Sequence, residues 1–246
     1  MIYPIIDEIL ESGIVKDKDG KDIPLRGNID RAEGMFLYNL VKENKSITHT
    51  LEVGCAFGIS SLFICSALRF KEAPLHIIID PHQEEAYNNI GNLNLQRAGV
   101  TFYKLIKENS EFALPRLLNQ TPNSFDLVFI DGLHSFDQVS LDFYYANRLL
   151  KVGGYIVFDD CSFYSISKVL SYVLNYPSYK FHSEVKETSR RKILLRSCLK
   201  LFPDFIYTNF LPLKVNNFYN RLRFTSMIAI KKVADDQRDN RWFSDF

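Results

Sequence analysis

The sequence predicts an α/β fold with a doubly wound, Rossmann-like sheet of seven strands, mainly parallel with one antiparallel edge strand. From residue 48 onward, short apolar runs alternate with helical segments. Runs such as 75–79 and 127–130 are apolar on both faces, as buried parallel strands require. After residue 178 this alternation stops, and two late strands follow without a regular crossover helix. We therefore expect those two strands to pair antiparallel at the edge of the sheet.

The chain divides into an N-terminal helical cap, residues 1–47, and a main domain, residues 48–246. A length of 246 residues is long for one domain and short for two, which favours one α/β domain with an appendage. The cap holds a short amphipathic piece, a polar loop at 16–22, and a helix beginning near residue 30. Asp30 and Glu33 have the spacing of a capping box at the start of that helix.

The main domain is expected to alternate strands and helices until a late insertion interrupts it. The expected elements are strand 50–53, helix 59–70, strand 75–80, helix 83–98, strand 100–106, helix 109–119, strand 125–131, helix 136–150, strand 154–159, helix 163–175, strand 179–185 and strand 224–230. The insertion 186–223 lies before the last strand and carries nine basic residues against two acids. So long an insertion usually covers a site, so we expect a lid, with a dimer or membrane surface as the alternative.

The composition is that of an ordinary globular protein. A net charge of +1 gives no global attraction to nucleic acid or to an anionic membrane. The four cysteines have no metal-ligand spacing, which is typical of reduced thiols in a cytosol. No apolar run is long enough for a transmembrane segment, and the first ten residues carry acids where a signal peptide has basic residues. We expect a cytoplasmic protein that binds no nucleic acid, with peripheral membrane contact and a homodimer left open.

The stretch 50–61 carries the first functional signal. A buried strand ends at Glu52 and Val53, and Gly54 and Gly58 then precede a helix that starts with serines. A glycine turn between a strand and a helix brings the backbone close to a nucleotide. The spacing of these glycines differs from the three-glycine dehydrogenase fingerprint.

Acidic residues also close several of the predicted strands. Parallel strands end at the same edge of a sheet, and ligands bind there. A single strand-end acid is usually a helix cap, but a whole edge of them indicates a cationic ligand or a metal. The residues are Glu52, Asp80, Asp131, Asp159 and Asp160.

These features together resemble the class I S-adenosylmethionine (SAM) methyltransferases, over about residues 28–233. The glycine turn is similar to their first motif, acid-x-G-x-x-x-G, and Asp80 closes the second strand as their ribose-binding acid does. The segments 125–134 and 149–160 are similar to the small O-methyltransferases of the catechol and caffeoyl-CoA type and their bacterial relatives. The helix that starts near Asp30 resembles the helix that lies over the cofactor in those enzymes.

The resemblance implies a cofactor site made of eight residues. Gly54 and Gly58 would face the methionine part of SAM, and Ser60 would bond its carboxylate, unless Ser60 is simply a helix N-terminal residue. Asp80 would accept both ribose hydroxyls, since one carboxylate can take two vicinal hydroxyls. Glu52 and Asp131 would hold the ammonium group. Asn109 and Ser110 would contact adenine, and His82 is expected in the loop near the adenine or ribose.

The resemblance also implies a divalent cation held by Asp131, Asp159 and Asp160. Oxygen ligands favour Mg²⁺ or a similar hard cation. The fifth-strand pair is Asp-Asp here, whereas the catechol enzymes have Asp-Asn. Asp160 as a plain helix cap is the alternative to a metal ligand.

His134 stands where the catechol-type enzymes have a lysine base, three residues after Asp131. An imidazole titrates near neutrality and can accept a hydroxyl proton, so His134 is the candidate catalytic base together with Asp131. A histidine that only bonds Asp131 or Asp137 is the alternative.

The resemblance thus implies a SAM-dependent O-methyltransferase acting on a hydroxyl of a small or glycosylated acceptor. Two other classes stay open: a same-fold enzyme of different chemistry, such as a hydroxylase-like relative, and a non-catalytic SAM-binding or membrane-docking protein. The sequence does not identify the acceptor.

Overall fold

The computed structural model describes residues 1–186 and 225–238. The insertion 187–224, with the predicted lid, and the aromatic tail 239–246 lie outside these described residues. The elements are α1 (Pro4–Ser12), β1 (Ile14–Lys16), β2 (Asp22–Pro24), α2 (Arg31–Glu43), β3 (His49–Val53), α3 (Ile59–Leu68), β4 (Leu75–Ile79), α4 (Ile90–Arg97), β5 (Tyr103–Ile106), α5 (Ser110–Gln120), β6 (Phe125–Ile130), α6 (Phe136–Leu149), β7 (Leu150–Phe158), α7 (Tyr164–Val173), β8 (Tyr179–Lys186) and β9 (Thr225–Lys232).

The main sheet has seven strands in the order β5-β4-β3-β6-β7-β9-β8. Strands β3 to β7 pair parallel, whereas β9 pairs antiparallel with both β7 and β8. This confirms the doubly wound sheet and its antiparallel edge. The strand order reverses between β3 and β6, which is the point where such sheets bind ligands.

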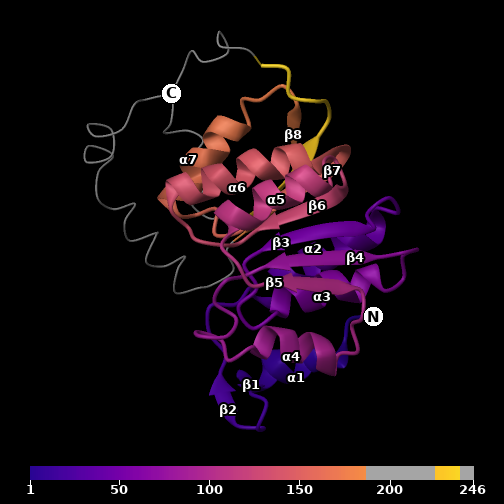
Figure 1. Cartoon of the computed structure of the whole chain (residues 1–246), viewed down its shortest axis with the longest axis vertical. Coiled ribbons are helices and arrows are strands. Elements are labelled where there is room, and N and C mark those ends of the chain that lie inside the picture. The colour runs from indigo at the N-terminus through magenta and orange to yellow at the C-terminus, as the bar shows by residue number, and fades with distance from the viewer. Residues whose placement is uncertain (187–224, 239–246) are drawn as a thin grey trace.

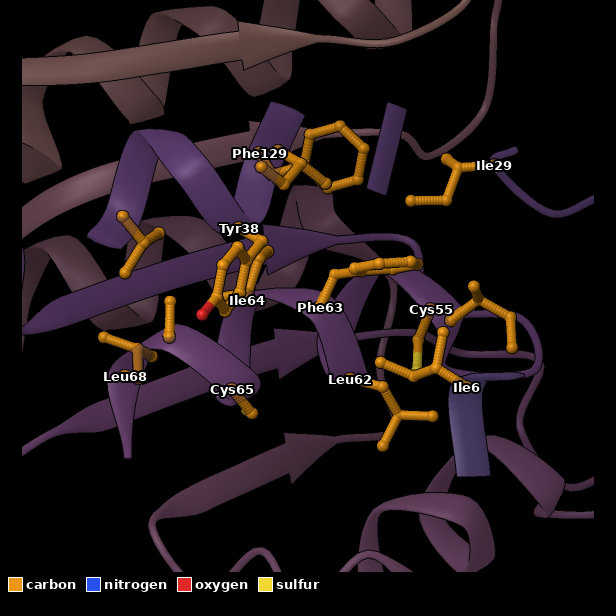
Figure 2. Close-up of a cluster of buried hydrophobic side chains, with 14 of the residues drawn as sticks. Ile6, Ile29, Tyr38, Cys55, Leu62, Phe63, Ile64, Cys65, Leu68 and Phe129 are labelled. Atoms are coloured by element: carbon orange, nitrogen blue, oxygen red, sulfur yellow. The ribbon is translucent and has the colours of Figure 1, made fainter. Parts of the chain in front are cut away.

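Helices cover both faces of the sheet (Figure 1). One buried cluster joins α1, α2, α3 and α4 to one face, and a second joins α5, α6 and α7 to the other. Figure 2 shows the first cluster, in which Leu62 and Phe63 of α3 lie among side chains from α1, α2 and β6. The N-terminal cap thus contributes to the same core as the sheet, and α2 is held beside the strand ends.

The cap departs from the sequence prediction at one place. The polar loop predicted at 16–22 is the turn of a short antiparallel hairpin, β1 with β2. The capping box is confirmed, because Asp30 accepts from the Glu33 backbone N–H and the Glu33 side chain accepts from the Asp30 N–H at 2.6 Å. No helix among the described residues is long and apolar enough to cross a membrane.

The largest correction concerns the helix predicted at 83–98. Helix α4 begins only at Ile90, and residues 81–89 form a series of turns. Asn88 and Asn89 have φ angles of 48° and 58°, which are left-handed and outside the helical region. The strand predicted at 100–106 is also shorter and begins at Tyr103.

Candidate functional site

The glycine turn lies where β3 meets the end of β6. Gly54 has a φ of 90°, and a side chain there would overlap the backbone carbonyl of Asp131. Only glycine has both the required backbone freedom and the required lack of a side chain. The turn is therefore pressed directly against the strand end that carries Asp131.

Glu52, at the end of β3, is completely buried and fully bonded inside the protein. Its carboxylate accepts from the Ser60 and Ser61 hydroxyls, and the His76 Nε2 atom lies 2.9 Å from Oε2. The other ring nitrogen of His76 contacts the Thr50 hydroxyl at 2.8 Å. These five buried side chains join β3, β4 and the start of α3 into one polar network.

Asp80, at the end of β4, is also saturated by the protein. Its Oδ2 atom accepts from the backbone N–H groups of Cys55 and Ala56 and from the Gln83 side chain. Its Oδ1 atom accepts from the His82 N–H at 2.8 Å. Asp80 is only 3% exposed, so its carboxylate holds the glycine turn to β4.

A different situation exists at the ends of β6 and β7, where carboxyl groups crowd together. Burial raises the pKa of Asp131 well above its usual range, and the neighbouring Asp160 and Glu52 raise it further. Burial likewise raises the pKa of Asp159, with Asp131 as the next cause. Glu33 of α2 faces the same group, and burial raises its pKa too. The carboxyl groups at the ends of β6 and β7 thus lie close to other carboxyl groups, whereas Glu52 and Asp80 are surrounded by hydrogen-bond donors.

His134 lies between two of these carboxyl groups. Its Nε2 atom is 3.4 Å from an Asp131 oxygen, and its Nδ1 atom is 3.5 Å from an Asp160 oxygen. One ligand atom from each of the three residues falls within 4.8 Å of the others. The side chains are 23% to 34% exposed, so solvent and ligands reach the group. Such a group can exchange a proton or bind a cation.

Two loops meet at His134. The Ser165 hydroxyl donates to the His134 carbonyl at 2.5 Å, which ties the β6–α6 loop to the start of α7. The Phe163 ring packs edge-on against the imidazole, with centroids 5.4 Å apart. Leu133, Phe136, Phe163 and Tyr164 are all more than 40% exposed. An apolar surface therefore borders the acidic group.

Comparison with known proteins shows the family to which this chain belongs. A methyltransferase-domain family model matches residues 51–161. A probable caffeoyl-CoA O-methyltransferase of Arabidopsis thaliana is 32% identical over 166 residues, which cover 65% of this chain and 66% of that protein. An uncharacterized protein of Acanthamoeba polyphaga mimivirus is 30% identical over 154 residues, covering 56% of this chain and 67% of that protein. The chain belongs to the SAM-dependent O-methyltransferases of the caffeoyl-CoA type.

Solved structures agree on the fold of this methyltransferase. An O-methyltransferase from Bacillus cereus, in complex with S-adenosylhomocysteine (SAH), superposes with a TM-score of 0.61 at 15% identity, covering 84% of this chain and 83% of that one. The O-methyltransferase TomG from Streptomyces achromogenes, in complex with SAM, gives 0.59 at 15% identity over 94% of this chain and 97% of that one. Both bind the cofactor or its product, and at this identity the likeness concerns the fold.

The methyltransferase brings most of its predicted site residues to one edge of the sheet. Glu52, Asp80, Asp131, Asp159 and Asp160 all lie at strand ends, as predicted. Ser60 lies in the first turn of α3, but its hydroxyl donates to Glu52. That contact occupies the Ser60 hydroxyl within the protein. The roles assigned to these residues stay predictions.

Asn109 and Ser110 lie at the start of α5, as predicted, and differ in their surroundings. Asn109 is the exposed N-cap of α5, whereas Ser110 is buried and donates to Asp142 Oδ1 at 2.6 Å. Gln138 donates to the same Ser110 hydroxyl at 2.8 Å. Burial raises the pKa of Asp142 to about 6. The methyltransferase thus uses the Ser110 hydroxyl to join α5 to α6.

Several residues of the site escaped sequence reasoning. His76 and Asp142 lie inside elements and reach the site through tertiary contacts, whereas Gln83 lies in the turns just after Asp80, where a helix was predicted. The capping-box spacing predicts only a helix cap for Glu33, which also lies near Asp160. A polar residue on a predicted buried strand, such as His76, is the signal that was available, because a buried polar group needs a partner.

Proposed function

We propose that this methyltransferase moves the methyl group of SAM to a hydroxyl oxygen of a small or glycosylated acceptor. The observation that carries the proposal is the group formed by Asp131, His134 and Asp160, three acid–base side chains that solvent reaches. The group adjoins the glycine turn, since Gly54 packs on the Asp131 backbone. A cofactor on the turn and an acceptor at His134 would therefore be neighbours.

The proposed cofactor site follows the predicted residues. SAM would lie along the glycine turn with its ribose toward Asp80 and its adenine toward the start of α5. The ammonium group would face Asp131 at the end of β6, because the Glu52 carboxylate already accepts hydrogen bonds from protein donors. The proposed cofactor-binding residues are Gly54, Gly58, Asp80, Asn109 and Asp131. The predicted residues Glu52, Ser60 and Ser110 use their side chains in hydrogen bonds within the protein and would support the site from behind.

His134 is the proposed base. As the acceptor oxygen attacks the methyl carbon, the carbon–sulfur bond breaks and SAH leaves, while the hydroxyl proton passes to the imidazole. The imidazolium so formed would lie between Asp131 and Asp160, and nearby carboxylates stabilise a positive ring. This arrangement supports a base better than a lone surface histidine would.

A divalent cation is the second proposed component. Asp131, Asp159 and Asp160 are the proposed oxygen ligands, and such a donor set would fit Mg²⁺ or a similar hard ion. Asp131 and Asp160 share one group of ligand atoms with His134, whereas Asp159 is not part of that group. A bound ion would lower the pKa of the acceptor hydroxyl. We expect removal of divalent ions with EDTA to lower both turnover and the melting temperature measured by calorimetry. Unchanged turnover and unchanged melting after EDTA and desalting would exclude the ion.

Base and metal ligand are exclusive roles for the His134 imidazole, and matched variants separate them. His134 lies close enough to share an ion with Asp131 and Asp160, as MnCl₂ titration can test by electron paramagnetic resonance. We expect Asp159→Asn to weaken Mn²⁺ binding and His134→Gln to leave it unchanged. The reverse result would make His134 the third ligand and remove it as the base.

The acceptor body is proposed to be apolar near its reacting hydroxyl. Leu133, Phe136, Phe163 and Tyr164 leave large apolar side chains exposed beside His134, and their burial under an acceptor would be favourable. Mass spectrometry with methyl-labelled SAM and a panel of phenolic, alkyl and glycosylated alcohols tests the function. Label on an acceptor oxygen with release of SAH supports it. Label on nitrogen or carbon only would overturn it.

A further inference from the structure

Gln83 occupies an unusual position against the carboxylate proposed to bind ribose. Gln83 follows Asp80 by three residues, and its side chain is completely buried. The Nε2 atom donates to the Asp80 Oδ2 atom at 2.9 Å and to the Ala56 carbonyl at 2.7 Å. Both neighbours are acceptors, so the amide nitrogen must face them.

The other end of this amide is unsatisfied. The Gln83 Oε1 atom is buried and has no hydrogen-bond partner among the described residues. It packs against Gly91 so closely that a side chain on Gly91 would lie 2.8 Å from it. A buried acceptor without a partner is costly. The position of Gln83 is therefore a compromise, in which one end of the amide is well bonded and the other is not.

The segment that carries Gln83 is also the one that departs from the predicted helix. Residues 81–89 form turns, with two left-handed asparagines just before α4. Tyr87 from this segment packs edge-on against Phe57 of the glycine turn at 5.2 Å. The segment thus covers both the turn and Asp80, and it holds this shape at the expense of helical backbone that its sequence favours.

We infer that Gln83 is a displaceable plug in the cofactor site, donating to Asp80 from the position that a ribose hydroxyl must take. Oδ2 of Asp80 already accepts three hydrogen bonds, and the residue is 3% exposed, so a vicinal diol cannot reach both oxygens while Gln83 is in place. Cofactor binding displaces the side chain and releases the segment 81–89. This inference rests on the proposed role of Asp80.

A plug of this kind lowers the apparent affinity for the cofactor. The observed dissociation constant is the intrinsic one divided by the fraction of molecules in which the site is open. Removing the amide should therefore tighten binding. Two hydrogen bonds stabilise the Gln83 side chain in the site, and its one unsatisfied atom destabilises it. Removing the amide should therefore lower the Kd about fivefold to tenfold.

The experiment measures SAH binding by isothermal titration calorimetry to the full chain. The variants are Gln83→Ala and Gln83→Asn, whose amide is one methylene too short to span both acceptors. Gln96→Ala, at an exposed position of α4, is the control. We expect tighter binding for both Gln83 variants and wild-type binding for the control. Equal or weaker SAH binding by both Gln83 variants, with thermal melting like that of the wild type, would overturn the plug.

Hydrogen exchange provides a second readout that does not depend on affinity. Without ligand, the amides of residues 82–90 should exchange faster in Gln83→Ala than in wild type, and SAH should change their exchange strongly in wild type. Identical exchange of this segment in both proteins would contradict the inference. Asp80→Ala separates the two proposals: wild-type SAH affinity in that variant removes the ribose role of Asp80, whereas the Gln83 results alone judge the plug.

Discussion

The two halves of the carboxyl edge treat their acidic residues in opposite ways. At β3 and β4, Glu52 and Asp80 are buried and each accepts three or four hydrogen bonds from the protein. At β6 and β7, Asp131 and Asp160 are 23% and 34% exposed and have each other and His134 as neighbours. The same residue type at equivalent places therefore stabilises a turn in one half and remains available to a ligand in the other.

An acidic residue at a strand end is therefore not a ligand-binding residue by its position alone. What distinguishes the halves is whether the protein already supplies donors to the carboxylate. Where it does, a ligand must displace a protein group, as we infer for Gln83. Where it does not, burial raises the pKa of Asp131 and Asp159, and the neighbouring carboxyl groups raise it further.

The largest expected effect comes from His134, in the exposed half. His134→Ala should lower kcat by about 10²–10⁴-fold while SAM affinity stays within error, because a general base contributes to the chemical step and not to cofactor binding. The loss in kcat should hold across the pH range in which the wild type is active. Wild-type kcat in the variant between pH 6 and 9 would return His134 to a structural role.

A loss of stability is expected from Glu52, in the saturated half. Glu52→Ala removes the acceptor of three buried donors, so the free energy of unfolding in urea should fall by about 3–5 kcal/mol. Ser61→Ala removes one donor of the same network and should cost only about 1 kcal/mol. If the two variants were equally stable, Glu52 would not be the centre of the network.

Asp142 combines the two situations, because it is a buried acid with one hydrogen-bonded oxygen and one oxygen without a partner. Ser110 donates to its Oδ1 atom, but Oδ2 has no partner among the described residues. Its folded pKa of about 6 exceeds the unfolded value, so the folded state binds the proton more tightly. Stability should therefore fall as pH rises from 4 to 6, by up to about 3 kcal/mol.

The matched variant for this pH dependence is Asp142→Asn. It cannot titrate, so its free energy of unfolding should lack this decline, and the difference from wild type should grow between pH 4 and 6. Urea denaturation at several pH values measures this. Parallel pH profiles for the two proteins would assign the decline to other groups.

The last expected effect is that of Asp80 on the cofactor. Asp80→Ala should weaken SAM binding by roughly 2–3 kcal/mol, because two ribose hydroxyls lose their acceptor. Part of that loss in affinity should be offset, because without Asp80 the Gln83 side chain loses one of the two hydrogen bonds that hold it in the cofactor site. Calorimetry that gives equal SAM affinity for wild type and Asp80→Ala would contradict the ribose assignment.

The fold and the strand-end positions of the acidic residues were predictable from the sequence. Alternating apolar runs and amphipathic segments predicted the parallel sheet, and the spacing of Gly54 and Gly58 predicted the turn. These features are local, because each depends on periodicity or on one backbone conformation. The carboxylates at the strand ends followed from the same pattern.

Which of those carboxylates accept hydrogen bonds from the protein was not predictable without the tertiary contacts. Thr50 and His76 are neighbours because β3 and β4 pair in that register, and this pairing brings the imidazole to Glu52. Gln83 reaches Asp80 because the chain bends where its periodicity predicts a helix. Hydrogen-bond partners depend on contacts between distant segments, which residue types and spacing do not encode one at a time.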